Sequence, residues 1–164
     1  MSGAGTESRE RRVVVVGMGS EYRRDDGAGQ AVVDEVVASR QDIPPVGPIA
    51  EPLDLLGLWD GADLAIVIDA VHSGAEPGTV QLIELDEAAN GRPDGGPPGT
   101  TSTHGIGLAG VLRLARAVGS APQRVVVVGI EGDDFGHGTG LTPAVGRAVP
   151  HAARHVIKLI EEVG

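Results

Sequence analysis

Four stretches of the chain have the hydrophobic pattern of β-strands. Residues 13–16 and 64–68 are continuous apolar runs, and residues 124–130 contain a second run of four valines. A run that is apolar on both faces is typical of a strand in a sheet covered on both sides. Residues 79–85 alternate apolar and polar positions, which predicts a half-exposed or edge strand.

Helical periodicity follows three of these stretches. Apolar residues keep one stripe from Gly27 to Val36, and residues 108–118 repeat that pattern. A Thr-Pro pair at 142–143 has the composition of a helix start, with threonine as cap and proline at the first helical position. We expect Pro150 to kink or split this last helix.

The segment between the first helix and the second strand is ambiguous. Residues 49–58 fit a short strand followed by a helical turn. Ahead of the first helix, Asp25 or Asp26 is expected to cap the helix and to complement its dipole.

Strands that alternate with helices predict an α/β fold with a largely parallel sheet and right-handed crossovers. The chain has 164 residues, which favours one domain. Residues 1–11 are polar and lack periodicity, so we expect a disordered tail there and a single domain over residues 12–164.

Composition excludes several classes of protein. The net charge is −10 and aromatic residues make up 2%, so the chain lacks the residues that neutralise phosphates and stack on bases, and nucleic acid is not expected as a partner. The absence of cysteine excludes disulfides and thiolate chemistry. No apolar run approaches the roughly 20 residues of a membrane span, and no signal peptide is visible, so we expect a cytoplasmic protein without membrane contact.

The candidate catalytic and metal-binding residues lie near the ends of the predicted strands. Asp26 follows the first strand, Asp69 ends the second apolar run, and His104 precedes the helix predicted at residues 108–118. Ligands of open α/β sheets bind beyond the carboxyl ends of the strands, so these three side chains are expected to converge. Two carboxylates and an imidazole suit a borderline divalent cation with positions left open for substrate.

Each of these residues also has a purely structural interpretation. Asp26 fits a helix cap, Asp69 a buried carboxylate with a hydrogen-bonding partner, and His104 an ordinary loop histidine. The pair His151 and His155 has a spacing that can chelate a metal, but a polar helix face explains that pair better.

A nucleotide-binding function is the less favoured reading of the first turn. The sequence GMGSEY has Tyr22 where a dinucleotide-binding motif needs its third glycine. Asp25 and Asp26 follow where a phosphate would bind, and like charges repel there.

Four motifs in order resemble the hydrogenase maturation proteases. They are VVVVGMGSEYRRDDGAGQAVV, AIVIDAVHSGAEPGTV, TSTHGIGLAGVL and VVVVGIEGDDFGHGTGLTPAVGRAV. The resemblance implies a three-layer α/β/α sandwich with a five-stranded, mostly parallel sheet that carries one antiparallel strand, residues 79–85. It also implies that Asp26, Asp69 and His104 contact the metal and carry catalysis.

The resemblance implies an endopeptidase that removes the C-terminal extension of a nickel–iron hydrogenase large-subunit precursor. Such an enzyme cleaves after nickel insertion and recognises nickel that the precursor supplies. The segment IAEPLD at residues 49–54 departs from the D-G-G-T pattern common in the family. That departure motivates the alternative, a non-catalytic assembly or metal-binding factor of the same fold.

Overall fold

The computed structural model describes residues 11–44, 46–85, 101–102 and 105–163. Its sheet follows the order β1 (Val13–Gly17), β2 (Leu64–His72), β5 (Val125–Glu131) and β3 (Val80–Glu84). The first three strands are parallel, and β3 runs antiparallel to β5. The two-residue strand β4 (Thr101–Ser102) pairs antiparallel with the last residues of β2.

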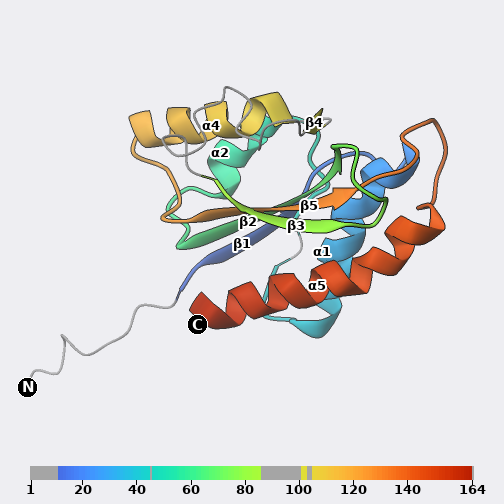
Figure 1. Ribbon diagram of the computed structural model, residues 1–164. Coiled ribbons are helices and arrows are strands. Elements are labelled where there is room, and N and C mark those ends of the chain that lie inside the picture. Colours follow the sequence, from blue (N-terminus) through green and yellow to red (C-terminus); the bar gives the residue numbers. More distant parts are fainter. Residues whose placement is uncertain (1–10, 45, 86–100, 103–104, 164) are drawn as a thin grey trace, which may run out of the picture.

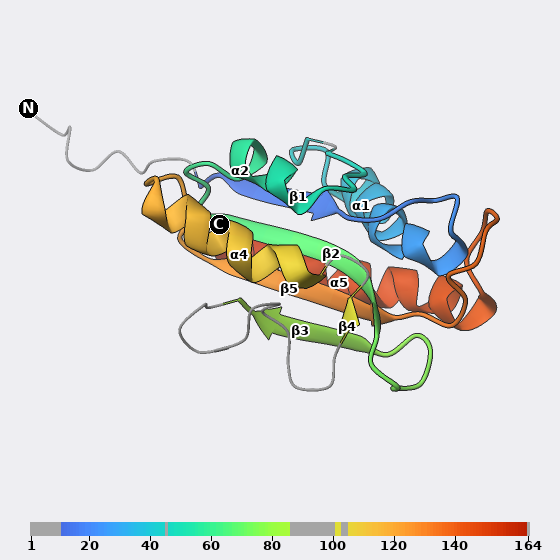
Figure 2. The same cartoon turned by 90° about the horizontal axis from the view of Figure 1, so that it is seen from above.

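Helices cover both faces of the sheet (Figure 1). On one face lie α1 (Ala28–Ser39) and α5 (Pro143–Val163), and on the other lie α2 (Leu55–Leu58) and α4 (Gly105–Ala117). The short helices η2 (Arg24–Gly27) and η3 (Pro52–Asp54) precede α1 and α2. Figure 2 shows the strands side by side between these layers.

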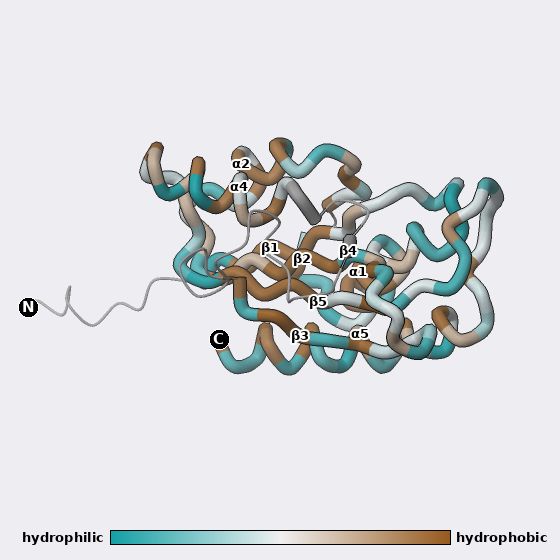
Figure 3. Tube along the Cα trace, turned by 45° about the horizontal axis from the view of Figure 1, so that its top comes forward, coloured by the Kyte–Doolittle hydropathy of each residue, from teal (hydrophilic) through white to brown (hydrophobic). Residues whose placement is uncertain are grey.

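The apolar runs become strands because both of their faces are buried. Alternate residues of β2 divide between two cores: Ile66 and Ile68 face α1 and α5, whereas Ala65 and Val67 face α2 and α4. The central strands are accordingly the hydrophobic centre of the molecule (Figure 3). The predicted α/β class is therefore confirmed. None of the described helices combines the length and apolarity that a membrane span needs.

The sheet differs in detail from the one expected. Among the described residues, four strands form its main path and the fifth is only the two-residue β4, so this part of the chain shows two antiparallel pairings rather than one. The prediction of an antiparallel strand at 79–85 is confirmed by β3. The short strand expected near Ile49 is a single bridge to Met18, because the chain turns into η3 three residues later.

One local prediction about helices is wrong, and a second is wrong in one of its two forms. Neither Asp25 nor Asp26 caps α1, whose N-cap is Gly27 without a side-chain hydrogen bond. Pro150 does not split α5, which continues through it. Pro150 itself is exposed, while the opposite face of α5 packs on the core, so tertiary packing outweighs the lost hydrogen bond.

Candidate functional site

The carboxyl ends of β1 and β2 meet at one edge of the sheet. The Met18 amide, just beyond β1, donates to the Ile68 carbonyl of β2 at 2.9 Å. The chain then turns into η2, which contacts β2 directly. Gly29 in the first turn of α1 fits closely there, because an added Cβ would lie 2.4 Å from the Ile68 carbonyl oxygen. This packing brings the segment that carries Asp26 to the end of the strand that carries Asp69.

Asp26 is enclosed by the turn that follows β1. Its side chain is 1% exposed, and Oδ2 accepts a hydrogen bond from the Ser20 amide at 2.8 Å. The Arg23 guanidinium lies 3.9 Å from the same oxygen. Gly19 has φ +115°, and a Cβ there would lie 2.2 Å from the Asp26 carbonyl oxygen, so the turn requires glycine. The GMG turn thus encloses the carboxylate of Asp26.

Asp69 is the sixth residue of β2 and is 1% exposed. Alternation along the strand directs its side chain to the face covered by α2 and α4. Its partner across the sheet is Gly129 of β5, which carries no side chain on that face. A buried carboxylate at this position needs polar partners, and Asp69 does interact with neighbouring groups.

His104 lies outside the described residues. In the sequence it falls between β4, which pairs with the end of β2, and the first residue of α4. Within the described ranges, no three histidine, aspartate or glutamate side chains gather closely enough to hold a metal ion. The structure therefore brings the elements of Asp26 and Asp69 to one edge, and the expected triad stays a prediction.

Asp25 has a role that the sequence analysis missed. It is fully buried, and its carboxylate accepts hydrogen bonds from the amides of Asp133, Asp134 and Thr142 at 2.8–3.0 Å. The Thr142 hydroxyl donates a further bond at 2.8 Å. Burial by itself raises the pKa of Asp25, but the bonds from Thr142, Asp134 and Asp133 together outweigh it and hold the pKa below its usual value. Asp25 thereby ties η2 to the loop after β5.

Glu131 makes a second tie between segments at this edge. It ends β5, is 3% exposed, and accepts hydrogen bonds from the Ser73 amide at 2.9 Å and the Ser73 hydroxyl at 2.5 Å. Ser73 directly follows β2. The glutamate therefore holds the ends of β2 and β5 together.

The segment at 49–54 packs against the start of α4. An added Cβ at Gly107 would lie 2.4 Å from Cγ of Pro52, so helix and segment touch without intervening space. Leu53 is 61% exposed beside this contact. The departure from the family pattern is thus accommodated by a compact η3 turn.

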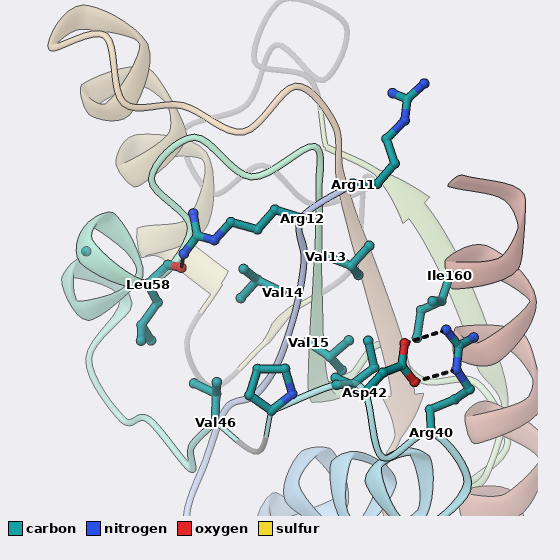
Figure 4. A pocket seen from close by; sticks show the side chains of 13 residues that line it. Arg11, Arg12, Val13, Val14, Val15, Arg40, Asp42, Val46, Leu58 and Ile160 are labelled. Carbon is teal, nitrogen blue, oxygen red and sulfur yellow. Dashed lines mark hydrogen bonds and ion pairs between the residues drawn. The ribbon is translucent and has the colours of Figure 1, made fainter. Parts of the chain in front are cut away.

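The groove in Figure 4 belongs to the opposite end of the molecule. It has a volume of about 1050 Å³ and is bordered by the start of β1, the end of α1 and the end of α2. Arg40 and Asp42 form an ion pair at 2.8 Å on its wall. Asp26 and Asp69 lie at the other ends of their strands, so this groove is separate from the candidate site.

Two solved structures have the same fold as this chain. The hydrogenase maturating endopeptidase HybD from Escherichia coli superposes with a TM-score of 0.73 and 27% identity, covering 93% of this chain and 94% of that protein. The hydrogenase maturation protease HybD from Thermococcus kodakarensis superposes with a TM-score of 0.74 at 23% identity, covering 90% and 98%. The second likeness shows the fold alone.

Sequence relatives then identify the family. The hydrogenase expression/formation protein HupD of Bradyrhizobium diazoefficiens is 30% identical over 85% of this chain and 73% of its own length. HoxM of Cupriavidus necator is 29% identical over 93% and 75%. The sequence profile of the hydrogenase maturation proteases matches residues 50–159. The chain belongs to the hydrogenase maturation protease family and is accordingly an endopeptidase-type hydrolase.

Proposed function

We propose that this chain removes the C-terminal extension of a nickel–iron hydrogenase large-subunit precursor after nickel has been inserted, and that it acts in the cytoplasm. The observation that carries the proposal is a pair of almost fully buried carboxylates, Asp26 and Asp69, on adjoining segments at the carboxyl edge of the sheet in a member of this family.

The metal in this proposal belongs to the substrate. Carboxylate oxygens are suitable ligands for a borderline divalent cation, and the donor chemistry of Asp26 and Asp69 therefore fits nickel. His104 would add the imidazole. Three such ligands without a thiolate leave coordination positions open for the groups by which the precursor holds its nickel.

Peptide hydrolysis sets the chemical task of the site. Water adds its hydroxyl to the scissile carbonyl carbon, and its protons pass to a base and to the departing amine. The nickel of the precursor would polarise the scissile carbonyl, activate the water, or only anchor the substrate. A carboxylate of the pair would bind the metal or receive the proton.

The test is cleavage of a nickel-loaded precursor by wild type, Asp26→Asn and Asp69→Asn, followed by mass spectrometry of the tail. We expect the two variants to lose at least about 100-fold in rate, because each removes a charged ligand or base. Asp60→Asn is the matched control, since Asp60 is exposed and lies at the opposite end of the sheet. Release of the tail by Asp69→Asn at the wild-type rate would refute the assignment.

The same assay distinguishes an endopeptidase from the alternative, a non-catalytic assembly or metal-binding factor of the same fold. The altered 49–54 segment favours that alternative. It predicts a stable complex between the chain and the precursor, an intact tail, and no effect of Asp69→Asn on the precursor.

A further inference from the structure

Arg23 is the cation next to the candidate carboxylate. Its Nη1 lies 3.9 Å from Oδ2 of Asp26, and the arginine side chain is 44% exposed while the aspartate is 1% exposed. The pair therefore joins a movable surface cation to a fixed, buried anion.

The backbone of Arg23 is held while its side chain can turn. The Arg23 amide donates to the Ser20 carbonyl at 3.2 Å, and its carbonyl accepts from the Asp26 amide at 3.1 Å. A bridge to Gly138 anchors the same residue to the loop after β5. Moving the guanidinium away from Asp26 thus requires side-chain rotation and no rearrangement of the turn.

The neighbouring Arg24 is engaged elsewhere. Its guanidinium lies 3.7 Å from Asp134, and its side chain is 45% exposed. Its amide donates to the Gly138 carbonyl at 3.0 Å. The two adjacent arginines therefore match in charge and exposure and differ in which carboxylate they meet.

We propose that Arg23 is a positioning residue that occupies Asp26 as a counter-cation until the metal carried by the precursor replaces it. A guanidinium and a divalent ion at one carboxylate repel each other, so a metal must displace Arg23 before it binds Asp26. For a free metal ion, only its bonds to the site residues offset the cost of displacing Arg23. For a metal carried by the precursor, contacts between the two proteins offset that cost as well. Arg23 thereby lowers the affinity for free metal ions and favours metal presented by the substrate.

The test measures the affinity of Ni²⁺ alone by calorimetry. Every protein compared, including the wild-type reference with Arg23 intact, carries His151→Gln and His155→Gln, because those ring centroids lie 4.8 Å apart on α5 and the rings can bind Ni²⁺ themselves. We expect Arg23→Gln to bind Ni²⁺ about five-fold more tightly, in keeping with a pair that is half exposed to solvent. Arg23→Met should behave alike, and Arg23→Lys should stay near wild type because it keeps the charge.

Two controls assign the effect to Asp26. Arg24→Gln removes the same charge one residue away and should leave the Ni²⁺ affinity within about two-fold of wild type. Adding Asp26→Asn to Arg23→Gln should abolish the gain. An Arg23→Gln affinity no higher than that of wild type, including no detectable binding by either protein, overturns the proposal.

This inference rests on the proposed function, but it can fail separately. If wild type cleaves a nickel-loaded precursor while Arg23→Gln and wild type bind Ni²⁺ equally, only the role of Arg23 is refuted. If no precursor is cleaved and the Ni²⁺ affinities still differ as expected, the role of Arg23 at the metal site stands and the endopeptidase assignment falls.

Discussion

The adjacent residues Asp25 and Asp26 of η2 have different roles. The buried carboxylate of Asp25 accepts hydrogen bonds from the loop after β5, whereas that of Asp26 accepts from the Ser20 amide and faces Arg23 at the edge of the sheet. One residue of separation in a 3₁₀ turn is enough to direct the two carboxylates to different neighbours. Asp25 is thus the anchor of the turn, and Asp26 is the residue that it presents.

Replacing Asp25 with asparagine should destabilise the protein. The variant Asp25→Asn substitutes an amide for a carboxylate that accepts four hydrogen bonds, so at least one donor loses its partner. We expect the free energy of unfolding to fall by about 2–3 kcal/mol. Urea unfolding followed by the fluorescence of Trp59, which is fully buried, measures this change. Asp60→Asn is the control and should change stability by less than about 0.5 kcal/mol.

The same residue gives a pH dependence. Because the folded-state pKa of Asp25 is lowered, its ionised form adds stability that is complete above the unfolded-state pKa of about 3.9 and is lost as the pH falls through the folded-state value. The stability difference between wild type and Asp25→Asn should therefore stay constant from about pH 5 to 7 and shrink below about pH 4. A difference that grows on acidification would contradict this assignment.

At the level of secondary-structure elements, the contact between η3 and α4 shapes the site. The η3 turn and α4 touch through Pro52 and Gly107, and α4 begins immediately after His104 in the sequence. Any side chain at position 107 must push these two elements apart. The position of the 49–54 segment therefore depends on one glycine.

Gly107→Ala tests this contact, and Gly110→Ala on the same helix is its matched control. A Cβ at Gly107 would meet Pro52 at 2.4 Å, whereas one at Gly110 meets only Nη2 of Arg113 at 3.8 Å. We expect Gly107→Ala to lose about 1–3 kcal/mol through overpacking and to lower the rate of tail removal. Gly110→Ala should gain about 0.5–1 kcal/mol from helix propensity and keep its activity. Equal stability of the two variants would show that α4 and η3 separate at no cost.

For the molecule as a whole, stability and metal recognition are separate properties. Two apolar cores on either side of the sheet hold the fold together. The segments at the candidate edge are tied by Asp25 and Glu131, whose partners are protein groups. We therefore expect folding not to depend on a bound ion.

Removal of metal should separate the two properties. We expect EDTA to leave the unfolding temperature of the chain unchanged within about 1 °C, because a ligand shifts stability only when it binds the folded state. Withholding nickel from the precursor should stop tail removal. Calorimetry of the chain measures the first outcome, and mass spectrometry of the precursor measures the second. A large drop in the melting temperature of the chain with EDTA would indicate a resident structural metal instead.

The sequence by itself determined the three parallel strands, because runs such as Val13–Val16 are stable only where both faces are buried. It also determined the family, since the four motifs keep their order. It pointed to Asp26 and Asp69 because a strand end in an α/β sheet is where ligands bind. Those local and topological signals need no knowledge of distant contacts.

Tertiary structure alone decided the role of Asp25, the single bridge at Ile49 and the continuity of α5 through Pro150. Asp25 acquires its partners from residues more than one hundred positions away, which no local pattern records. The helix continues through Pro150 because packing of its apolar face outweighs one missing hydrogen bond. Sequence pattern sets what each segment prefers, and long-range contacts decide which preference is kept.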